Sequence, residues 1–339
     1  MADVEPDAGS QVGEDFKLFV KRIKTTLEAI DKRVRRLHDQ GHREEYILAA
    51  ERDSVFKVMK EGNGFLCDTV KYFTPDEHAI HEQYFREKVA HLAAGSAIMH
   101  RAQSRPLGYA GDYEMMRMCY DNTYEGSTLL GKILHKYSTE LPMVQAIRNR
   151  RELIAQFAQG KRRILSVACG PACEVALVSA SYPKATFSFT LLDQDKEALD
   201  FARARLSGLS NVDISYVNIS VYSMMKQDDL GAQLGKFDCI YSMGLFDYLN
   251  DKAAKKLCCR LVDMLGPDGT LIVGNYHARC ANRWETQYWC DWTLQHRTEE
   301  SMLDLVPDLG ADHQSEILYE QTRAQMFLKI QKTSMLSKL

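Results

Sequence analysis

The sequence predicts an α/β protein in which a Rossmann-like nucleotide-binding domain follows an N-terminal α-helical domain. Residues 163–168 and 185–192 are short continuous apolar runs, which are typical of buried parallel strands. A turn at Gly170 and Pro171 joins the first run to a helix-compatible segment. The second run ends at Asp193, about twenty residues after that turn, where dinucleotide-binding folds place an acidic residue.

The N-terminal part of the chain has helical periodicity. Apolar residues recur at spacings of three and four over 16–37, and similar patterns cover 44–59 and 76–98. Pro75 precedes the last of these as a helix-start signal, whereas Gly62 and Gly64 predict a turn.

The turn and the carboxylate predict a binding site for a nucleoside. Glycine lets the backbone approach a ligand closely, and the N-terminus of the following helix offers free N–H groups. Asp193 is positioned to accept both ribose hydroxyls. Because only Gly170 remains of the G-x-G-x-x-G pattern, a tightly bound pyrophosphate is disfavoured, and so are NAD and FAD.

These residues resemble the first motif of class I S-adenosylmethionine-dependent methyltransferases, and residues 162–332 follow the order of that fold. Residues 211–218, a strand with its loop at 237–249, a turn at 265–269 and residues 270–275 resemble its next strands. Residues 317–320 and 325–331 resemble its closing antiparallel hairpin. The resemblance implies a seven-stranded sheet with an antiparallel last strand and S-adenosyl-L-methionine as cofactor.

We therefore expect a disordered tail (1–14), a helical domain with a lid or substrate loop (15–140), an S-adenosylmethionine-binding methyltransferase domain (141–332) and a C-terminal targeting tail (333–339). Arg150 is the candidate partner of the cofactor carboxylate. The other candidate cofactor-binding residues are Ala168, Cys169, Gly170, Asp193, Gln194, Asn218, Ser220, Met243 and Gly244.

A second group of motifs supports a narrower resemblance. Pro106, Gly108 and Gly111 break the helical pattern among aromatic and acidic residues, which favours a binding loop over 105–116. This loop, with residues 124–126, 146–150, 191–195, 274–276 and 291–297, resembles the bacterial 3-hydroxy fatty acid methyl ester biosynthesis (extracellular factor) group. That resemblance implies methylation of the carboxylate of a 3-hydroxyacyl signalling molecule.

The segment 276–289 lacks an Asn-Pro pair expected in that group, so the acceptor stays open. It is expected to line the acceptor pocket, and Trp284, Tyr288, Trp289 and Trp292 are either an aromatic surface for the sulfonium or a core stripe. The alternatives to carboxylate methylation are cyclisation of S-adenosylmethionine to azetidine-2-carboxylate, O- or N-methylation of a secondary metabolite, and a non-catalytic S-adenosylmethionine-binding partner protein.

Tyr109, Asp112, Tyr113 and His277 are the candidate catalytic residues. A carboxylate acceptor is already ionised at neutral pH, whereas a hydroxyl or amine requires a base, for which His277 is the nearest candidate. Asp247 and Asp112 are the next candidates for that role. Tyr109 and Tyr113 lie in the predicted lid loop.

Composition favours a small-molecule substrate. The net charge of -3 gives no electrostatic signal for nucleic acid, and no apolar run is long enough to span a membrane. The nine cysteines indicate a reducing compartment, and Cys169 and Cys173 suit tight packing better than redox chemistry. His78 and His81 are expected to be surface residues, because their spacing matches no zinc motif. We expect no metal, and the oligomeric state is open.

The chain ends in Ser337-Lys338-Leu339, the address read by the peroxisomal import receptor. The expected location is therefore the peroxisome if the source is eukaryotic, and the cytoplasm otherwise.

Overall fold

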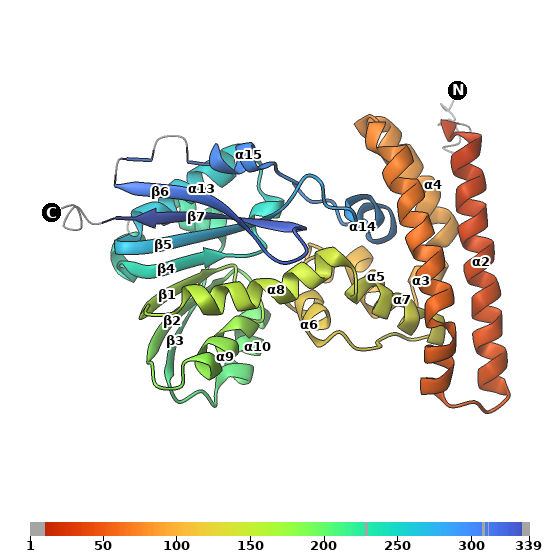
Figure 1. Ribbon diagram of the computed structural model, residues 1–339, viewed down its shortest axis with the longest axis horizontal. Coiled ribbons are helices and arrows are strands. Elements are labelled where there is room, and N and C mark those ends of the chain that lie inside the picture. The colour runs from red at the N-terminus through yellow and green to blue at the C-terminus, as the bar shows by residue number, and fades with distance from the viewer. Residues whose placement is uncertain (1–10, 228–229, 307–308, 311, 334–339) are drawn as a thin grey trace, which may run out of the picture. The chain divides into compact units, whose positions relative to one another are not determined.

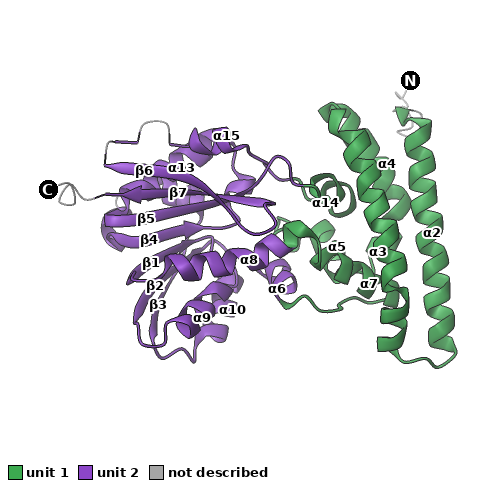
Figure 2. Cartoon of the chain, in the orientation of Figure 1, with its two compact units in different colours: residues 1–111, 121–144, 281–293 green, residues 112–120, 145–280, 294–339 purple. Residues whose placement is uncertain are grey.

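The computed structural model describes residues 11–227, 230–306, 309–310 and 312–333. The described chain forms two compact units, a helical unit (residues up to 111, 121–144 and 281–293) and a sheet unit (112–120, 145–280 and 294 onward), as Figure 2 shows. The predicted boundary at residue 140 thus differs from the observed division. Most of the predicted tails, including Ser337-Lys338-Leu339, lie outside the described residues.

The sheet unit is built on seven strands in the order β3-β2-β1-β4-β5-β7-β6 (Figure 1). The strands are β1 (Arg163–Val167), β2 (Phe187–Asp193), β3 (Val212–Asn218), β4 (Phe237–Ser242), β5 (Leu265–Tyr276), β6 (His313–Tyr319) and β7 (Gln325–Lys332). Strands β1 to β5 pair in parallel, and β7 runs antiparallel to both of its neighbours. This arrangement confirms the predicted Rossmann-like methyltransferase sheet with an antiparallel last strand.

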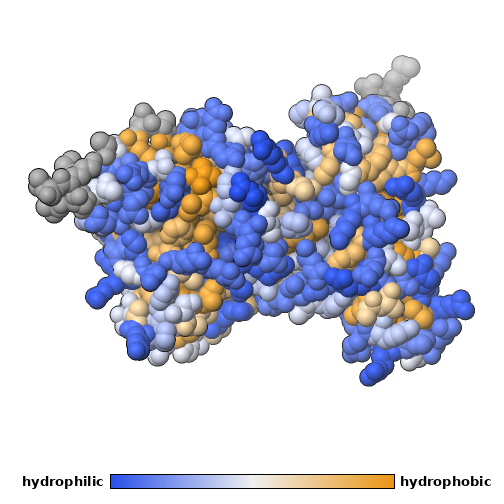
Figure 3. All heavy atoms as spheres, in the orientation of Figure 1, coloured by the Kyte–Doolittle hydropathy of each residue, from blue (hydrophilic) through white to orange (hydrophobic). Residues whose placement is uncertain are grey.

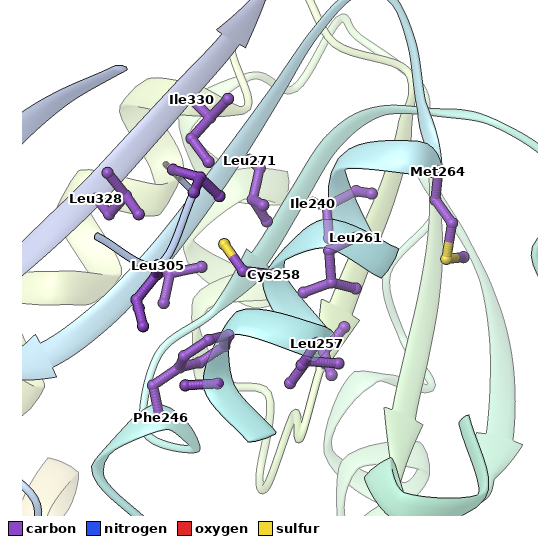
Figure 4. Packing of buried hydrophobic residues seen from close by; sticks show 14 of the residues in the cluster. Ile240, Phe246, Leu257, Cys258, Leu261, Met264, Leu271, Leu305, Leu328 and Ile330 are labelled. Carbon is purple, nitrogen blue, oxygen red and sulfur yellow. The ribbon is translucent and has the colours of Figure 1, made fainter. Parts of the chain in front are cut away.

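Both faces of the sheet are covered by helices. The helices are α6 (Tyr113–Asp121), α8 (Pro142–Phe157, mostly in this unit), α9 (Cys173–Ser181), α10 (Lys196–Leu206), α11 (Val221–Lys226), α12 (Leu230–Leu234), η2 (Phe246–Tyr248), α13 (Asp251–Asp263) and α15 (Glu299–Leu303). One core cluster joins α8, α9 and α10 to the sheet. Another, shown in Figure 4, packs Leu257, Cys258 and Leu261 of α13 against Ile240, Leu271 and Leu328.

The helical unit contains α2 (Glu14–Asp39), α3 (Glu44–Thr69), η1 (Val70–Tyr72), α4 (Pro75–Ala93), α5 (Ala97–Ser104), α7 (Leu129–Thr139) and α14 (Arg283–Cys290). The apolar stripe of α2 is buried as its periodicity predicts. The start signal at Thr74 forms a capping box with Glu77.

Two local predictions in this unit are wrong. Gly62 and Gly64 lie inside α3 and not in a turn. A Cβ at Gly62 would lie 2.8 Å from Ile23 Cδ1, so this glycine serves the close packing of α2 on α3. The helix predicted over 76–98 is two helices, because the chain turns near Gly95 and Ser96 then caps α5.

The turn predicted over 265–269 belongs to β5, which starts at Leu265 with an irregular register beside Phe237. Among the described residues, no helix is both long and apolar enough to cross a membrane. Hydrophilic residues are widely distributed over the face in Figure 3, with apolar residues interspersed.

Candidate functional site

The carboxyl ends of β1 to β5 share one edge of the sheet, because these strands are parallel. Strand β1 leads into residues 168–172, β2 ends at Asp193, and β4 leads into Met243 and Gly244. Strand β3 ends at Asn218, which pairs in register with Asp193. Except for Arg150 in α8, all predicted cofactor-binding residues therefore lie along this edge.

The loop after β1 has three alternate residues in the left-handed backbone conformation. Their φ angles are 54° at Ala168, 52° at Gly170 and 46° at Ala172. Glycine occupies one of these positions, and alanine adopts the same conformation at the other two at a steric cost. The backbone of this loop thus has the conformation of a glycine-rich loop, although Gly170 is the one glycine in residues 168–172. A Cβ at Gly170 would meet no atom within 4 Å, so the strain caused by a substitution at this position would come from φ alone.

Asp193 holds this loop. Its Oδ2 accepts a hydrogen bond from the Gly170 N–H at 2.8 Å, and its Oδ1 accepts one from the Asp195 N–H at 3.0 Å. Burial raises the pKa of Asp193, and these backbone hydrogen bonds oppose the shift. A carboxylate oxygen can accept more than one hydrogen bond, so this geometry is compatible with the predicted ribose contact.

The neighbouring strand end is fixed in a similar way. Asn218 Nδ2 donates to the carbonyl oxygens of Asp193 and Gln194, at 3.0 and 2.8 Å. Ser220 caps α11 by accepting from the Ser223 N–H. Cys169 is buried, and burial raises the pKa of its thiol well above the usual value, which favours packing over redox chemistry.

Arg150 places a buried cation beside the end of β4. Its Nη1 donates to the Met243 carbonyl at 3.0 Å, and its Nη2 lies 3.5 Å from Met116 Sδ of α6. A Cβ at Gly244 would lie 3.4 Å from that Nη1, so the absence of a side chain there leaves room for the guanidinium. Burial alone would lower the pKa of Arg150, but Tyr120, Tyr276 and Glu174 outweigh it and raise the pKa.

Asp112 and Tyr113 belong to the sheet unit, whereas Tyr109 lies in the helical unit, in the segment between α5 and α6. Asp112 is buried, and its Oδ1 accepts from the Met115 N–H at 2.8 Å in the first turn of α6. The Tyr113 ring lies 5.5 Å from that of Phe201, and its hydroxyl lies 3.5 Å from Glu197. Both of these partners are in α10, which follows Asp193 in the chain.

His277 is hydrogen-bonded at both ring nitrogens. Its Nδ1 accepts from the Arg279 N–H at 3.0 Å, so Nε2 carries the proton and donates to Glu299 Oε2 at 3.1 Å. Hydrogen bonds from Tyr319 and His277 lower the pKa of Glu299 to about 2, which keeps this acceptor ionised. Through its hydrogen bond to Glu299, His277 joins the end of β5 to the start of α15.

The aromatic stripe lies in the core of the helical unit. Tyr288 and Trp289 are buried and pack edge-on against Phe85, and Trp284 stacks on His78. The expectation that this segment lines an acceptor pocket has no support here. His81 is buried and contacts Phe16, so the prediction of surface histidines is wrong. The described residues include no cluster of three or more potential metal ligands.

Sequence reasoning missed one buried acid beside the cofactor loop and understated another. Glu174 Oε1 accepts from Tyr241 Oη at 2.8 Å, and burial raises the pKa of Glu174. Asp247 Oδ1 accepts from the Tyr276 N–H at 2.7 Å, and burial raises the pKa of Asp247 to about 7. Glu174 resembles an ordinary acid in a first helical turn, so no sequence signal marks its burial.

Residues 164–269 match a protein family described as a methyltransferase domain. The sheet unit therefore contains an S-adenosylmethionine-dependent methyltransferase domain. The match covers β1 to the first part of β5 and includes the loop at 168–172, Asp193 and Met243. This edge of the sheet combines a backbone loop, the Asp193 carboxylate and, beside Met243, the buried guanidinium of Arg150.

One solved structure is similar over most of the chain. A possible exported protein from Bordetella parapertussis is similar over 87% of this chain and 99% of its own, at 17% identity and a TM-score of 0.52. The N-methyltransferase NodS from Bradyrhizobium japonicum WM9, in complex with S-adenosyl-L-homocysteine, is 16% identical over 57% of this chain and 90% of its own, with a TM-score of 0.41.

Magnesium protoporphyrin IX methyltransferase from Synechocystis PCC 6803, with bound S-adenosylhomocysteine, is 10% identical over 57% of this chain and 85% of its own, with a TM-score of 0.44. A comparison with curated proteins gave no match.

Proposed function

We propose that the enzyme transfers the methyl group of S-adenosylmethionine to the carboxylate of a small-molecule acid, with a 3-hydroxy fatty acid as the acceptor class. The observation that carries this proposal is the state of His277, whose two ring nitrogens both take part in hydrogen bonds. A carboxylate is ionised at neutral pH, so its methylation requires no proton removal. The motifs that resemble those of the 3-hydroxy fatty acid methyl ester group support the same class of acceptor.

The reaction is an in-line displacement. A carboxylate oxygen attacks the methyl carbon, the bond from that carbon to the sulfonium sulfur breaks, and the products are a methyl ester and S-adenosylhomocysteine. The task of the protein is to hold the acceptor in line and to exclude water. Gly170, Asp193 and Arg150 are the residues we assign to the cofactor, and the last of these would pair with its carboxylate.

The test uses the full chain, methyl-labelled S-adenosylmethionine and 3-hydroxydecanoic acid, with decanoic acid as a second acceptor. The expected product is a methyl ester, from which mild alkali releases labelled methanol. Label that survives alkali belongs to an ether or an amine and would show that the acceptor atom is a hydroxyl oxygen or a nitrogen.

An incubation without an acceptor addresses the cyclase alternative. Release of methylthioadenosine with formation of azetidine-2-carboxylate would replace the carboxylate proposal. Tight cofactor binding without turnover of any acceptor tested would instead favour the non-catalytic alternative.

A further inference from the structure

Arg297 ends the 291–297 motif, and it is deeply buried in the sheet unit, at 4% exposure. All five N–H groups of its guanidinium donate hydrogen bonds. Nη1 donates to the Phe246 carbonyl at 2.8 Å and to Asn275 Oδ1 at 2.6 Å. Nη2 donates to the Leu249 carbonyl at 2.7 Å, and Nη2 and Nε both donate to Asp251 Oδ1, at 2.9 and 3.2 Å. A planar, rigid fork can satisfy this set of acceptors, and a lysine cannot.

The positions of these hydrogen-bond acceptors in the fold indicate which segment the Arg297 guanidinium holds. Phe246, Leu249 and Asp251 belong to the segment that follows the carboxyl end of β4, and Asn275 lies near the carboxyl end of β5. Asp251 has a side chain that is 73% exposed, so the ion pair at this end contributes little. The bonds to Phe246, Leu249 and Asn275 are the ones that hold the segment.

Four further hydrogen bonds, each with at least one backbone partner, join the same segments. The Tyr276 N–H donates to Asp247 Oδ1 at 2.7 Å, and the Gln295 N–H donates to the Asp247 carbonyl at 2.7 Å. Asn275 Nδ2 donates to the Gln295 carbonyl at 2.8 Å, and the Arg297 N–H donates to the Tyr276 carbonyl at 3.1 Å. Three chain segments are therefore locked to one another at the carboxyl edge of the sheet.

We propose that Arg297 is a positioning residue for methyl transfer, which fixes the segment 245–249 and, with it, the acceptor side of the site. This inference rests on the proposed function for the identity of the acceptor. None of the five hydrogen bonds reaches residues 168–172 or Asp193. We therefore expect Arg297 to affect the alignment of the acceptor more than the affinity for the cofactor. A misalignment of about 1 Å is enough to reduce the rate of a positioned reaction about a hundredfold.

The test compares Arg297→Lys with Asp251→Asn, which removes the charge at the exposed end of the same network. We expect Arg297→Lys to accelerate amide hydrogen exchange over 245–249 by about tenfold or more and to lower kcat about 30-fold or more. S-adenosylhomocysteine affinity and KM for S-adenosylmethionine should stay within about threefold of wild type. Asp251→Asn should change each quantity by less than about twofold.

Two results overturn the proposal: unchanged exchange over 245–249 in Arg297→Lys, or a clear loss of S-adenosylhomocysteine affinity in that variant. The exchange and affinity measurements need no acceptor, so they remain decisive if 3-hydroxydecanoic acid is not turned over. If Arg297→Lys does not fold, Asn275→Ser removes one acceptor and leaves the fork its other partners. Full kcat in folded Asn275→Ser would also contradict the proposal.

Discussion

The most informative residue is Asp193, because it combines a predicted role with an observed one. It is expected to bind the ribose, and in the structure its two oxygens hold the Gly170 and Asp195 N–H groups. Asp193→Ala should weaken S-adenosylmethionine binding by about 1.5 to 3 kcal/mol, the usual contribution of hydrogen bonds to a charged group. Calorimetric titration of folded protein measures this.

Asp200→Ala is the matched control, since Asp200 is a partly exposed acid of α10 that pairs with Lys196 and Arg203. This variant should bind the cofactor as the wild type does. Equal affinity in the two variants would remove the ribose assignment.

Ala168 provides a second test at the scale of a single residue. Its φ of 54° is unfavourable for any residue with a Cβ, and its side chain is only partly buried. Ala168→Gly should therefore stabilise the fold by about 1 kcal/mol, measured by denaturant unfolding. Ala176→Gly, in the interior of α9, should destabilise it by about 1 kcal/mol. Destabilisation by both substitutions would show that the loop is not strained at Ala168.

At the scale of elements, the periodicity of the sequence predicted the features that depend on residues close together in the chain. The apolar runs of β1 and β2 are mostly buried because both faces of the sheet are covered, and the stripe of α2 is buried. Gly62 was misread because its reason, the approach of Ile23, comes from another helix. The left-handed conformation of Ala168 and Ala172 could not be predicted either, because the identity of an alanine gives no indication of its φ angle.

The predicted lid segment 105–116 is still to be tested. If it closes over the site, Tyr109→Ala and Tyr113→Ala should lower kcat about tenfold or more, with little change in cofactor affinity. Thermal melts should accompany the kinetics, because Tyr113 also contacts Glu197 and Phe201. Normal turnover with a lowered Tm would show that the segment stabilises the fold and takes no part in turnover. Tyr222→Ala, at an exposed tyrosine of α11, serves as the control.

Asp247 makes the loop after β4 sensitive to pH. Burial raises the pKa of Asp247 to about 7, whereas an unfolded aspartate titrates near 4. The folded state therefore binds the proton more tightly, and this stabilisation is lost as pH rises from about 4 through 7. Asp247→Asn, which stays neutral, should gain stability relative to wild type as pH increases over that window. Unfolding free energies at pH 5 and 8 test this, and a difference that does not grow with pH contradicts it.

At the scale of the whole molecule, the two units exchange segments. Residues 112–120 fold with the sheet unit, although the chain on both sides belongs to the helical unit, and 281–293 fold with the helical unit. A sequence read from one end to the other predicts contiguous domains, because composition and periodicity carry no information about which distant surface a helix packs on. This is why the boundary at 140 differs from expectation and why the sequence left two alternatives open for the tryptophans, whereas the order of the strands was predicted.

The last prediction concerns the destination of the protein. We propose that Ser337-Lys338-Leu339, if Leu339 is the free carboxyl end, is read by the peroxisomal import receptor of a eukaryotic cell. A fluorescent protein fused to the N-terminus should then enter peroxisomes, and deletion of the tripeptide should leave it in the cytosol with unchanged S-adenosylhomocysteine binding. Met335→Ala, just outside the tripeptide, should not alter import. A fusion that stays in the cytosol with the tripeptide intact would count against the address, and the enzyme would then meet its acceptor in the cytoplasm.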